Sequence, residues 1–289
     1  MPIEILAQSL INGIFLGGVY ALVAGGLTLI YGVIYVVNFA HADFLMVGMY
    51  ISYWAFVLLG IDPYISVFIC AFILFIIGVV TQKVLIQPVL KAPMLNQILL
   101  TMGLSSLIVG LAQFFWRSEP RSILVPYAAN RLVVGELILN VPRMIAFVVS
   151  VVITLSLYLF LKKTKTGKAI RACSQSRPAA QLMGIDVKKM YVLTFGIGTA
   201  LTGIAGALLT PTFSMSPTVG LTFSITAFVV VVLGTMGNFL GAFIGALIIG
   251  VTEAFSGLYL GGELRQLGSM VIFILVLLLK PGGLFGGKK

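Results

Sequence analysis

Charged residues are scarce in this 289-residue chain: they make up 9% of it, where a soluble domain carries about a quarter. The eight acidic residues and the one histidine leave few groups for acid–base chemistry, and the chain shows no Ser-His-Asp arrangement and no metal-spaced Cys/His cluster. The sequence therefore predicts a protein that is not an enzyme and holds no metal. The two cysteines, Cys70 and Cys173, fall in an apolar run and in a basic loop, so no structural disulfide is expected.

A nucleotide-binding motif is also lacking. The segment GGLFGGKK at 282–289 superficially matches a phosphate-binding loop, but no Ser or Thr follows its lysine, and an apolar run rather than a strand precedes it. We therefore expect that this chain binds no cofactor of its own.

Apolar residues dominate the chain, at 60% of the composition with a mean hydropathy of +1.15. The apolar runs are long and continuous rather than alternating, which favours membrane-spanning helices over a β-barrel. The sequence predicts an all-α, polytopic transmembrane helical bundle that forms a single domain over residues 1–289. The apolar segments are approximately 6–30, 40–60, 62–82, 94–115, 143–161, 190–212, 221–236, 239–256 and 264–280.

Two places leave the number of segments open. The first segment can continue to Val37 as a broken or re-entrant stretch. The seventh and eighth segments are short and are joined only by Gly237-Asn238, so they can also form one long kinked unit. The prediction is therefore about eight or nine membrane segments.

The basic loop at about 162–189 carries eight basic residues and one acidic residue, which is +7 of the net charge of +10. An excess of Lys and Arg between apolar spans marks a cytoplasmic loop. This placement also puts residues 82–91 and the C-terminal tail in the cytoplasm and, with nine segments, the N-terminus outside. Because one loop explains the basic balance, we expect contact with the lipid bilayer and not with nucleic acid. A simpler interpretation of the loop is that it has no protein partner and that its charge only attracts it to anionic lipid.

Two short helices are predicted within this basic loop. Thr164 or Thr166 would N-cap the first helix, which runs to about Ser174. Ser176 would N-cap the second, and Gly184 would end it in the left-handed conformation. The apolar side chains that remain available to a partner are Ala180, Leu182, Met183 and Ile185.

The outer loop at about 116–142 is rich in proline and mixed charge but contains no catalytic cluster, so we interpret it as a connector that has room for an external partner. Small residues recur at four-residue spacing in two apolar segments. In lipid, this spacing lets helix backbones approach closely, which predicts helix packing. The glycines concerned are Gly13, Gly17, Gly25, Gly237, Gly241 and Gly245.

Few polar groups lie within the apolar segments, so those present are candidates for a translocation path or a gate. They are Asn38, His41 and Asp43 near the start of the second segment, and Glu253 in the eighth. Ionisable groups at membrane depth are costly and usually face a bundle interior or a water-filled path. The structural alternative is that these residues lie at interface depth or cap a helix, with Asn38 as the N-cap of the second segment.

The order and spacing of many short motifs identify a family. They are Asn12-Gly13, Tyr20-Ala21-Leu22, Leu27-Thr28, Tyr31-Gly32, Asn38-Phe39-Ala40-His41, Gly167-Lys168-Ala169-Ile170-Arg171-Ala172, Ala180, Gly184-Ile185, Leu193-Thr194-Phe195, Val232 to Asn238, Gly241-Ala242, Ile244-Gly245 and Lys280 to Gly286. Nearly end to end, the chain resembles the membrane-spanning permease subunit of bacterial and archaeal ABC uptake systems for branched-chain amino acids.

The resemblance implies the ABC importer permease fold in the cytoplasmic (inner) membrane of a prokaryote. It also implies partners: cytoplasmic ABC ATPase subunits that use the ATP, a second related permease subunit in a heterodimer, and an external solute-binding protein. The implied ATPase-coupling residues are Gly167, Arg171, Ala172, Ala180, Leu182, Met183, Gly184 and Ile185.

One position departs from the family pattern. Ala42-Asp43 stands where members often have Gly-Glu, so the acid is one methylene shorter and the turn before it is stiffer. Two alternative functions stay open. One is an ABC permease for urea or short amides, and the other is an ion-coupled secondary transporter or channel in which Asp43 or Glu253 carries a proton.

Overall fold

Apolar helices make up most of the computed structural model, which describes residues 3–280 and 282–286. They are α1 (Ile3–Ile34), α2 (Asp43–Leu59), α3 (Pro63–Thr81), α5 (Met94–Trp116), α6 (Val141–Lys163), α9 (Val187–Leu209), α10 (Val219–Leu233), α11 (Phe239–Leu260) and α12 (Arg265–Leu279). The predicted polytopic helical bundle is thereby confirmed, and each predicted apolar segment corresponds to one helix.

Within the described residues, seven helical stretches are long and apolar enough to cross a membrane, whereas α2 and α10 are shorter. The third of the nine apolar helices, α3, continues through the π-helix η1 (Gln82–Ile86) into α4 (Gln87–Val89), and the 3₁₀ turn η2 (Gly262–Leu264) leads into α12. The chain is therefore a multi-pass membrane protein.

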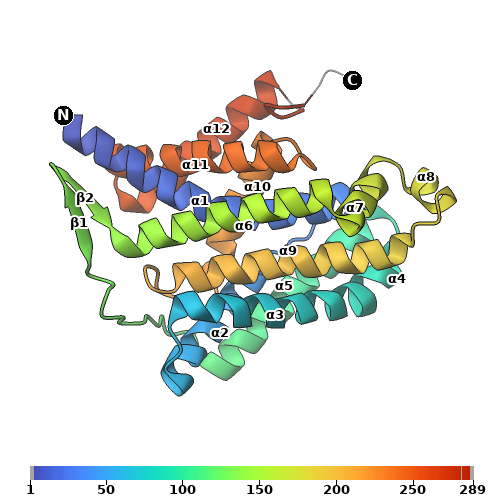
Figure 1. The fold of residues 1–289 in the computed structure, drawn as a ribbon, viewed down its shortest axis with the longest axis horizontal. Coiled ribbons are helices and arrows are strands. Elements are labelled where there is room, and N and C mark those ends of the chain that lie inside the picture. The colour runs from blue at the N-terminus through green and yellow to red at the C-terminus, as the bar shows by residue number, and fades with distance from the viewer. Residues whose placement is uncertain (1–2, 281, 287–289) are drawn as a thin grey trace.

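The long helices run roughly along one axis of the molecule, which gives it two distinct ends (Figure 1). At one end, here called the hairpin end, lies the antiparallel pair β1 (Arg131–Val134) and β2 (Leu137–Asn140), close to the start of α1. At the other end, here called the basic end, lie α7 (Lys165–Gln175) and α8 (Arg177–Leu182). Lys83, Lys188 and Lys189 line one cavity, so the predicted basic segments 82–91 and 162–189 meet at the same end. Of the predicted tail, Lys288 and Lys289 lie outside the described residues.

The hairpin was not predicted from the sequence. Its strands are only four residues long and lie in a proline-rich loop, where turn signals obscure the short alternation of side chains. The turn between them contains Gly135 at φ 62°, a left-handed conformation that suits glycine. The Gln8 side chain accepts a bond from the Ile138 N–H at 2.9 Å and donates one to its carbonyl at 2.8 Å, which fixes the hairpin to α1.

The two helices of the basic loop form as predicted. The Thr164 hydroxyl accepts a hydrogen bond from the Gly167 N–H at 2.9 Å, and the Ser176 hydroxyl accepts one from the Ala179 N–H at 3.4 Å. Gly184 follows α8 at φ 77°, which is the predicted left-handed stop.

The apolar side chains of this loop divide into two groups. Leu182 and Met183 are 89% and 82% exposed at the tip of the loop. Ala180, which we predicted to be available to a partner, is buried, because α8 packs this face against α7 and α9. Ile185 is half-buried against the core. The prediction of an available surface is therefore wrong for Ala180 and applies fully only to Leu182 and Met183.

The close packing of α1 against α11 depends on residues without side chains. A Cβ built on Gly13 would lie 2.6 Å from the Val251 Cα, and one built on Gly17 would lie 2.8 Å from the Ala246 carbonyl oxygen. These distances are shorter than carbon atoms tolerate, so the two backbones meet only because both positions are glycine. Further along α1, Gly25 faces the Phe239 ring.

The second group of glycines brings α10 and α11 together. Gly241 faces the Gly234 carbonyl, Gly245 faces the Val230 carbonyl, and Gly237 faces Gly32 at the end of α1. The alternative of one long kinked unit is wrong, because the chain reverses between the two helices. Gly237 at φ 85° and Thr235 at φ 72° form this reversal, and α10 and α11 pack as an antiparallel pair.

The chain between α1 and α2 folds back into the bundle. Tyr35 leaves α1 at φ 58°, and an imidazole nitrogen of His41 lies 3.0 Å from the Val23 carbonyl oxygen. Val23 lies eleven residues before the end of α1. At 1.5 Å per residue, residues 35–42 therefore return by roughly 16 Å. α2 starts inside the bundle, which confirms the re-entrant alternative for the stretch after the first segment.

Asn38 is not the N-cap of α2, so this alternative is wrong. The position before α2 is Ala42, and the Asn38 side chain instead accepts a hydrogen bond from the Ala40 N–H at 3.1 Å. A turn at residues 39–42 separates Asn38 from the first N–H groups of the helix. Its oxygen therefore bonds to the nearest free N–H, two residues further along the chain.

Candidate functional site

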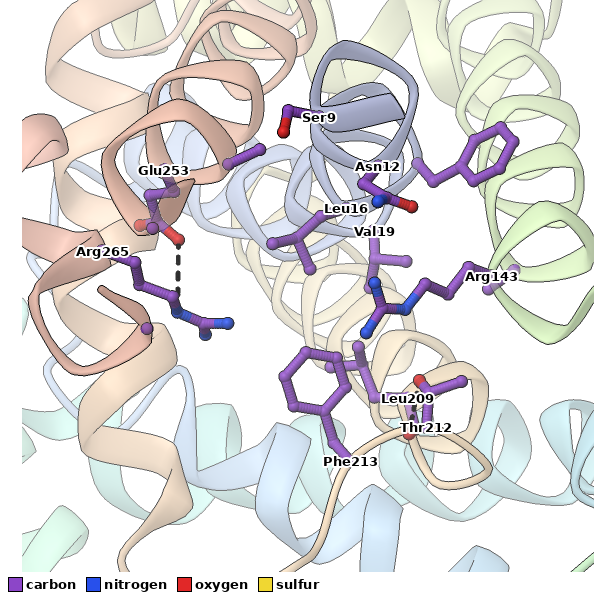
Figure 2. A pocket seen from close by; sticks show the side chains of 15 residues that line it. Ser9, Asn12, Leu16, Val19, Arg143, Leu209, Thr212, Phe213, Glu253 and Arg265 are labelled. Carbon is purple, nitrogen blue, oxygen red and sulfur yellow. Dashed lines mark hydrogen bonds and ion pairs between the residues drawn. The ribbon is translucent and has the colours of Figure 1, made fainter. Parts of the chain in front are cut away.

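A cavity of about 260 Å³ opens near the hairpin end, between α1, α6, α11 and α12 (Figure 2). Its position inside one bundle makes it the leading candidate for a solute site, since ligand sites in bundles lie between facing helices. The residues that line it are Ser9, Asn12, Phe15, Leu16, Val19, Arg143, Ala146, Leu209, Thr212, Phe213, Glu253, Ala254, Gly257, Gly262 and Arg265.

Glu253 lies at the wall of this cavity and is 1% exposed. One carboxylate oxygen accepts a hydrogen bond from the Tyr20 hydroxyl at 2.7 Å, and the other accepts one from the Thr226 hydroxyl at 3.2 Å. The Arg265 Nε lies 3.9 Å from the first oxygen. One carboxylate therefore joins α1, α10, α11 and α12, which explains how an acid is retained at this depth.

Two guanidinium groups extend into the cavity from opposite sides, Arg143 from α6 and Arg265 from α12 (Figure 2). Arg265 pairs with Glu253 and also lies over the Phe213 ring, with its Cζ 5.8 Å from the ring centre. Among the described residues, the Arg143 guanidinium has no hydrogen-bond or ion-pair partner. The cavity therefore has two positive charges and one negative charge.

Local structure fixes the backbone position of Arg143. Pro142 occupies the first turn of α6, and the Asn140 side chain caps this helix by accepting a hydrogen bond from the Arg143 N–H at 3.1 Å. Capping fixes the Cα of Arg143 at the start of α6. From this position the side chain extends into the cavity.

Apart from Ser9, Asn12 and Thr212, most of the remaining wall of the cavity is apolar. Leu16 and Val19 come from α1, and Leu209 and Phe213 come from the end of α9 and the turn after it (Figure 2). The Phe213 ring packs edge-on against the Phe223 ring, with 6.0 Å between their centres. This contact fixes the position of the Phe213 ring. The cavity thus presents charged groups beside a rigid apolar surface.

Family comparisons identify what kind of bundle holds this cavity. Residues 9–279 match the protein family described as branched-chain amino acid transport system / permease component. The chain belongs to this family. It is a permease component and not an enzyme, since its relatives are named transport system permease proteins.

The similarity to individual relatives extends over nearly the whole permease. The high-affinity branched-chain amino acid transport system permease protein LivH of Salmonella typhimurium is 33% identical over 96% of this chain and 95% of its own length. The corresponding protein BraD of Pseudomonas aeruginosa is 32% identical with the same coverage. A probable branched-chain amino acid transport permease protein LivH of Methanocaldococcus jannaschii is 31% identical over 95% of this chain and 91% of its own length. No solved structure matches the permease.

Of the four predicted path or gate residues, only Glu253 lines the cavity. Asn38, His41 and Asp43 lie together in and after the re-entrant segment, and all three are buried. Besides its contact with α1, the His41 ring lies 2.9 Å from the Thr202 hydroxyl on α9. His41 therefore holds the re-entrant segment between α1 and α9 and does not meet Glu253.

Asp43 is the first residue of α2 and is 2% exposed. A Cβ built on Gly220, the second residue of α10, would lie 2.6 Å from an Asp43 carboxylate oxygen. The carboxylate thus lies against the N-termini of two helices, where the exposed N–H groups carry partial positive charge. These two helix dipoles stabilise a buried acid that has no cation beside it within residues 3–280 and 282–286.

The basic end is tied to α1 by Arg177, the first residue of α8. Its guanidinium donates a hydrogen bond to the Ile34 carbonyl oxygen at 2.6 Å and stacks over the Tyr35 and Tyr191 rings, at 4.7 and 5.3 Å from their centres. The Tyr35 hydroxyl in turn donates to the Ser174 carbonyl at 2.9 Å. The loop that carries Leu182 and Met183 is therefore anchored to the end of the helix whose other half lines the cavity.

Sequence reasoning missed Arg143 and Arg265 as cavity residues. It also missed that Arg177 bonds to the end of α1. Arg143 and Arg265 stand at the starts of the fifth and ninth apolar segments, where a cation is normally interpreted as an interface residue. Only the packing of α6 on α1, and of α12 on α10 and α11, brings both side chains into one cavity (Figure 2).

Proposed function

We propose that this permease is the membrane-spanning subunit of an ABC importer that carries branched-chain amino acids across the prokaryotic cytoplasmic membrane. The observation that carries the proposal is the similarity, over at least 95% of this chain, to relatives from two bacteria and one archaeon that are named branched-chain amino acid permeases. ATP would be hydrolysed by separate subunits, since the sequence offers no complete phosphate-binding loop.

Sidedness follows from the distribution of charge. Lysines of the 82–91 and 162–189 segments meet at the basic end, which supports placing that end in the cytoplasm. The cavity near the hairpin end then faces the outside, where a solute-binding protein would deliver the amino acid. The family description speaks of a component of a transport system, which supports a second, related permease subunit as a further partner in a heterodimer.

The tip of the basic loop supports docking to an ATPase. Leu182 and Met183 are largely exposed next to the left-handed Gly184, so they form a small apolar projection on the proposed cytoplasmic side. Arg177 fixes this projection to the end of α1. A push on the projection would therefore reach α1, whose N-terminal half lines the cavity. This connection gives ATP-driven closure a rigid path to the solute site.

The test is uptake by a defined complex. The permease and the subunits that copurify with it are reconstituted into liposomes, with the solute-binding protein and leucine outside and ATP inside. Leucine uptake is expected with ATP and is expected to stop with a non-hydrolysable analogue. Uptake by this chain alone, driven by a proton gradient without ATP, would contradict the proposal and favour an ion-coupled transporter.

A further inference from the structure

We propose that the cavity between α1, α6, α11 and α12 is a binding site for the carboxylate of an apolar amino acid, which Arg143 and Arg265 hold from opposite sides. The inference rests on the proposed function, because it assigns the transported solute to a site. It goes further because it names the groups that recognise the solute. It also gives the orientation of the solute, with its carboxylate between the two arginines.

The first argument is charge. Both oxygens of Glu253 already accept hydrogen bonds from side chains, and its charge is shared with Arg265. The Arg143 guanidinium has no such partner among the described residues. A carboxylate between the two arginines balances the remaining positive charge and accepts paired N–H bonds, the geometry in which guanidinium binds anions best.

The second argument is the arrangement of the walls. Leu16, Val19 and Phe213 form an apolar surface beside the two arginines (Figure 2). On the α1 side, the Ser9 hydroxyl and the Asn12 amide supply oxygen acceptors that suit an ammonium group. The cavity therefore has separate places for a carboxylate, an ammonium group and an aliphatic side chain.

The third argument is size. A volume of about 260 Å³ lies just below the range of roughly 300–1,000 Å³ that is usual for ligand pockets. A free amino acid fits this volume, whereas a peptide of several residues or a whole lipid exceeds it. The class of ligand is thus a free apolar amino acid.

The test places a reporter thiol in the cavity. Gly257 lines it, and a Cβ at this position would have only the Arg265 Cβ nearby, at 3.5 Å, an ordinary contact. Gly257→Cys therefore adds a small thiol without a clash. The native Cys70 and Cys173 are both buried, so the unsubstituted permease serves as the blank.

Charge selectivity is the first readout. In the Gly257→Cys permease within its complex, an anionic methanethiosulfonate is expected to react roughly tenfold faster than a cationic one, relative to their rates with a free thiol. Adding Arg143→Gln should remove most of this preference. Arg131→Gln is the matched control, because Arg131 lies exposed in β1 at the same end and does not line the cavity. Equal rates for both reagents would overturn the assignment.

Ligand protection is the second readout. Millimolar leucine is expected to slow modification of Cys at position 257, and 4-methylpentanoate, which keeps the carboxylate, should also protect. Leucinamide lacks the carboxylate and should not protect. Arg143→Gln should abolish protection by leucine, whereas Arg131→Gln should leave it unchanged. Equal protection by leucinamide and leucine, or by inorganic phosphate and leucine, would overturn the proposal.

These outcomes separate the site from the function. If the complex takes up leucine with ATP but leucine gives no protection, the cavity is not the site and the proposed function stands. If leucine protects the thiol but no uptake depends on ATP, the site stands and the proposed function fails.

Discussion

At the scale of single residues, buried acids in this permease are stabilised in two different ways. Glu253 receives hydrogen bonds from two hydroxyl groups and lies near a guanidinium. Asp43 has no cation partner in the part of the chain that the structure describes, and it instead lies at the N-termini of α2 and α10. The first acid faces the cavity and the second does not, so substitutions at the two positions should have different effects.

Asp43 is predicted to be a structural residue. Asp43→Asn keeps the size and a hydrogen-bonding oxygen but loses the interaction of a charge with two helix dipoles, at a cost of about 1–2 kcal/mol. It should lower the maximal rate of leucine uptake more than it changes the half-saturating concentration. Asp43→Leu, which also removes the polar group, should impair assembly further. Uptake across a range of leucine concentrations checks this, and a large rise in the half-saturating concentration at an unchanged maximal rate would show that Asp43 binds the solute.

At the scale of helices, the most consequential contact is the backbone packing of α1 on α11. Both helices carry residues of the cavity wall, so their separation fixes its width. Gly13 and Gly17 permit this separation because they have no side chains. The glycines therefore act on the site through the distance between two helices.

Gly13→Ala tests this packing. The added Cβ would meet the Val251 Cα at 2.6 Å, and because the obstacle is backbone, the helices must move apart. Overpacking of this kind costs about 1–3 kcal/mol, so the melting temperature of the purified permease should fall. Gly103→Ala is the matched control, since a Cβ at this position in α5 meets nothing within 4 Å and gains helix propensity. Equal melting temperatures for the two variants would show that the contact is not tight.

At the scale of the whole molecule, the two ends have different surfaces. The basic end carries the exposed projection of Leu182 and Met183, and the hairpin end carries the cavity. α1 connects them over 32 residues, with Arg177 attached at one end and Ser9 and Asn12 at the other. One continuous helix thus joins the proposed ATPase contact to the proposed solute site.

Met183→Asp tests the proposed ATPase contact. The side chain is largely exposed, so the substitution should leave membrane insertion and the melting temperature unchanged. A charge in an apolar interface should weaken ATPase docking on the order of thirtyfold, as loss of about 2 kcal/mol at an interface hot spot does. The checks are copurification of the ATPase and ATP-driven uptake. Leu124→Asp is the control, because Leu124 is a similarly exposed apolar residue of the outer loop at about 116–142. This variant should retain both ATPase copurification and uptake. Wild-type uptake by Met183→Asp would remove the coupling assignment.

The sequence by itself determined the features that depend on neighbouring residues. Runs of apolar residues predicted the nine apolar helices found within the described residues, and the basic loop predicted which segments share an end. Thr164, Ser176 and Gly184 predicted the short helices of that loop. These signals are local, because hydrophobic length, side-chain caps and left-handed glycine act within a few residues of the chain.

Only the tertiary structure decided which of these residues meet. α1 is apolar on all its faces, so no periodicity shows that Gly13 turns toward α11 while Asn12 turns into a cavity. Arg143 and Arg265 look like ordinary interface cations until α6 and α12 bring them together beside Glu253. Such partners are distant in sequence. In a chain that is hydrophobic throughout, burial in lipid and burial in protein select the same residue types, so the packing of helices alone distinguishes them.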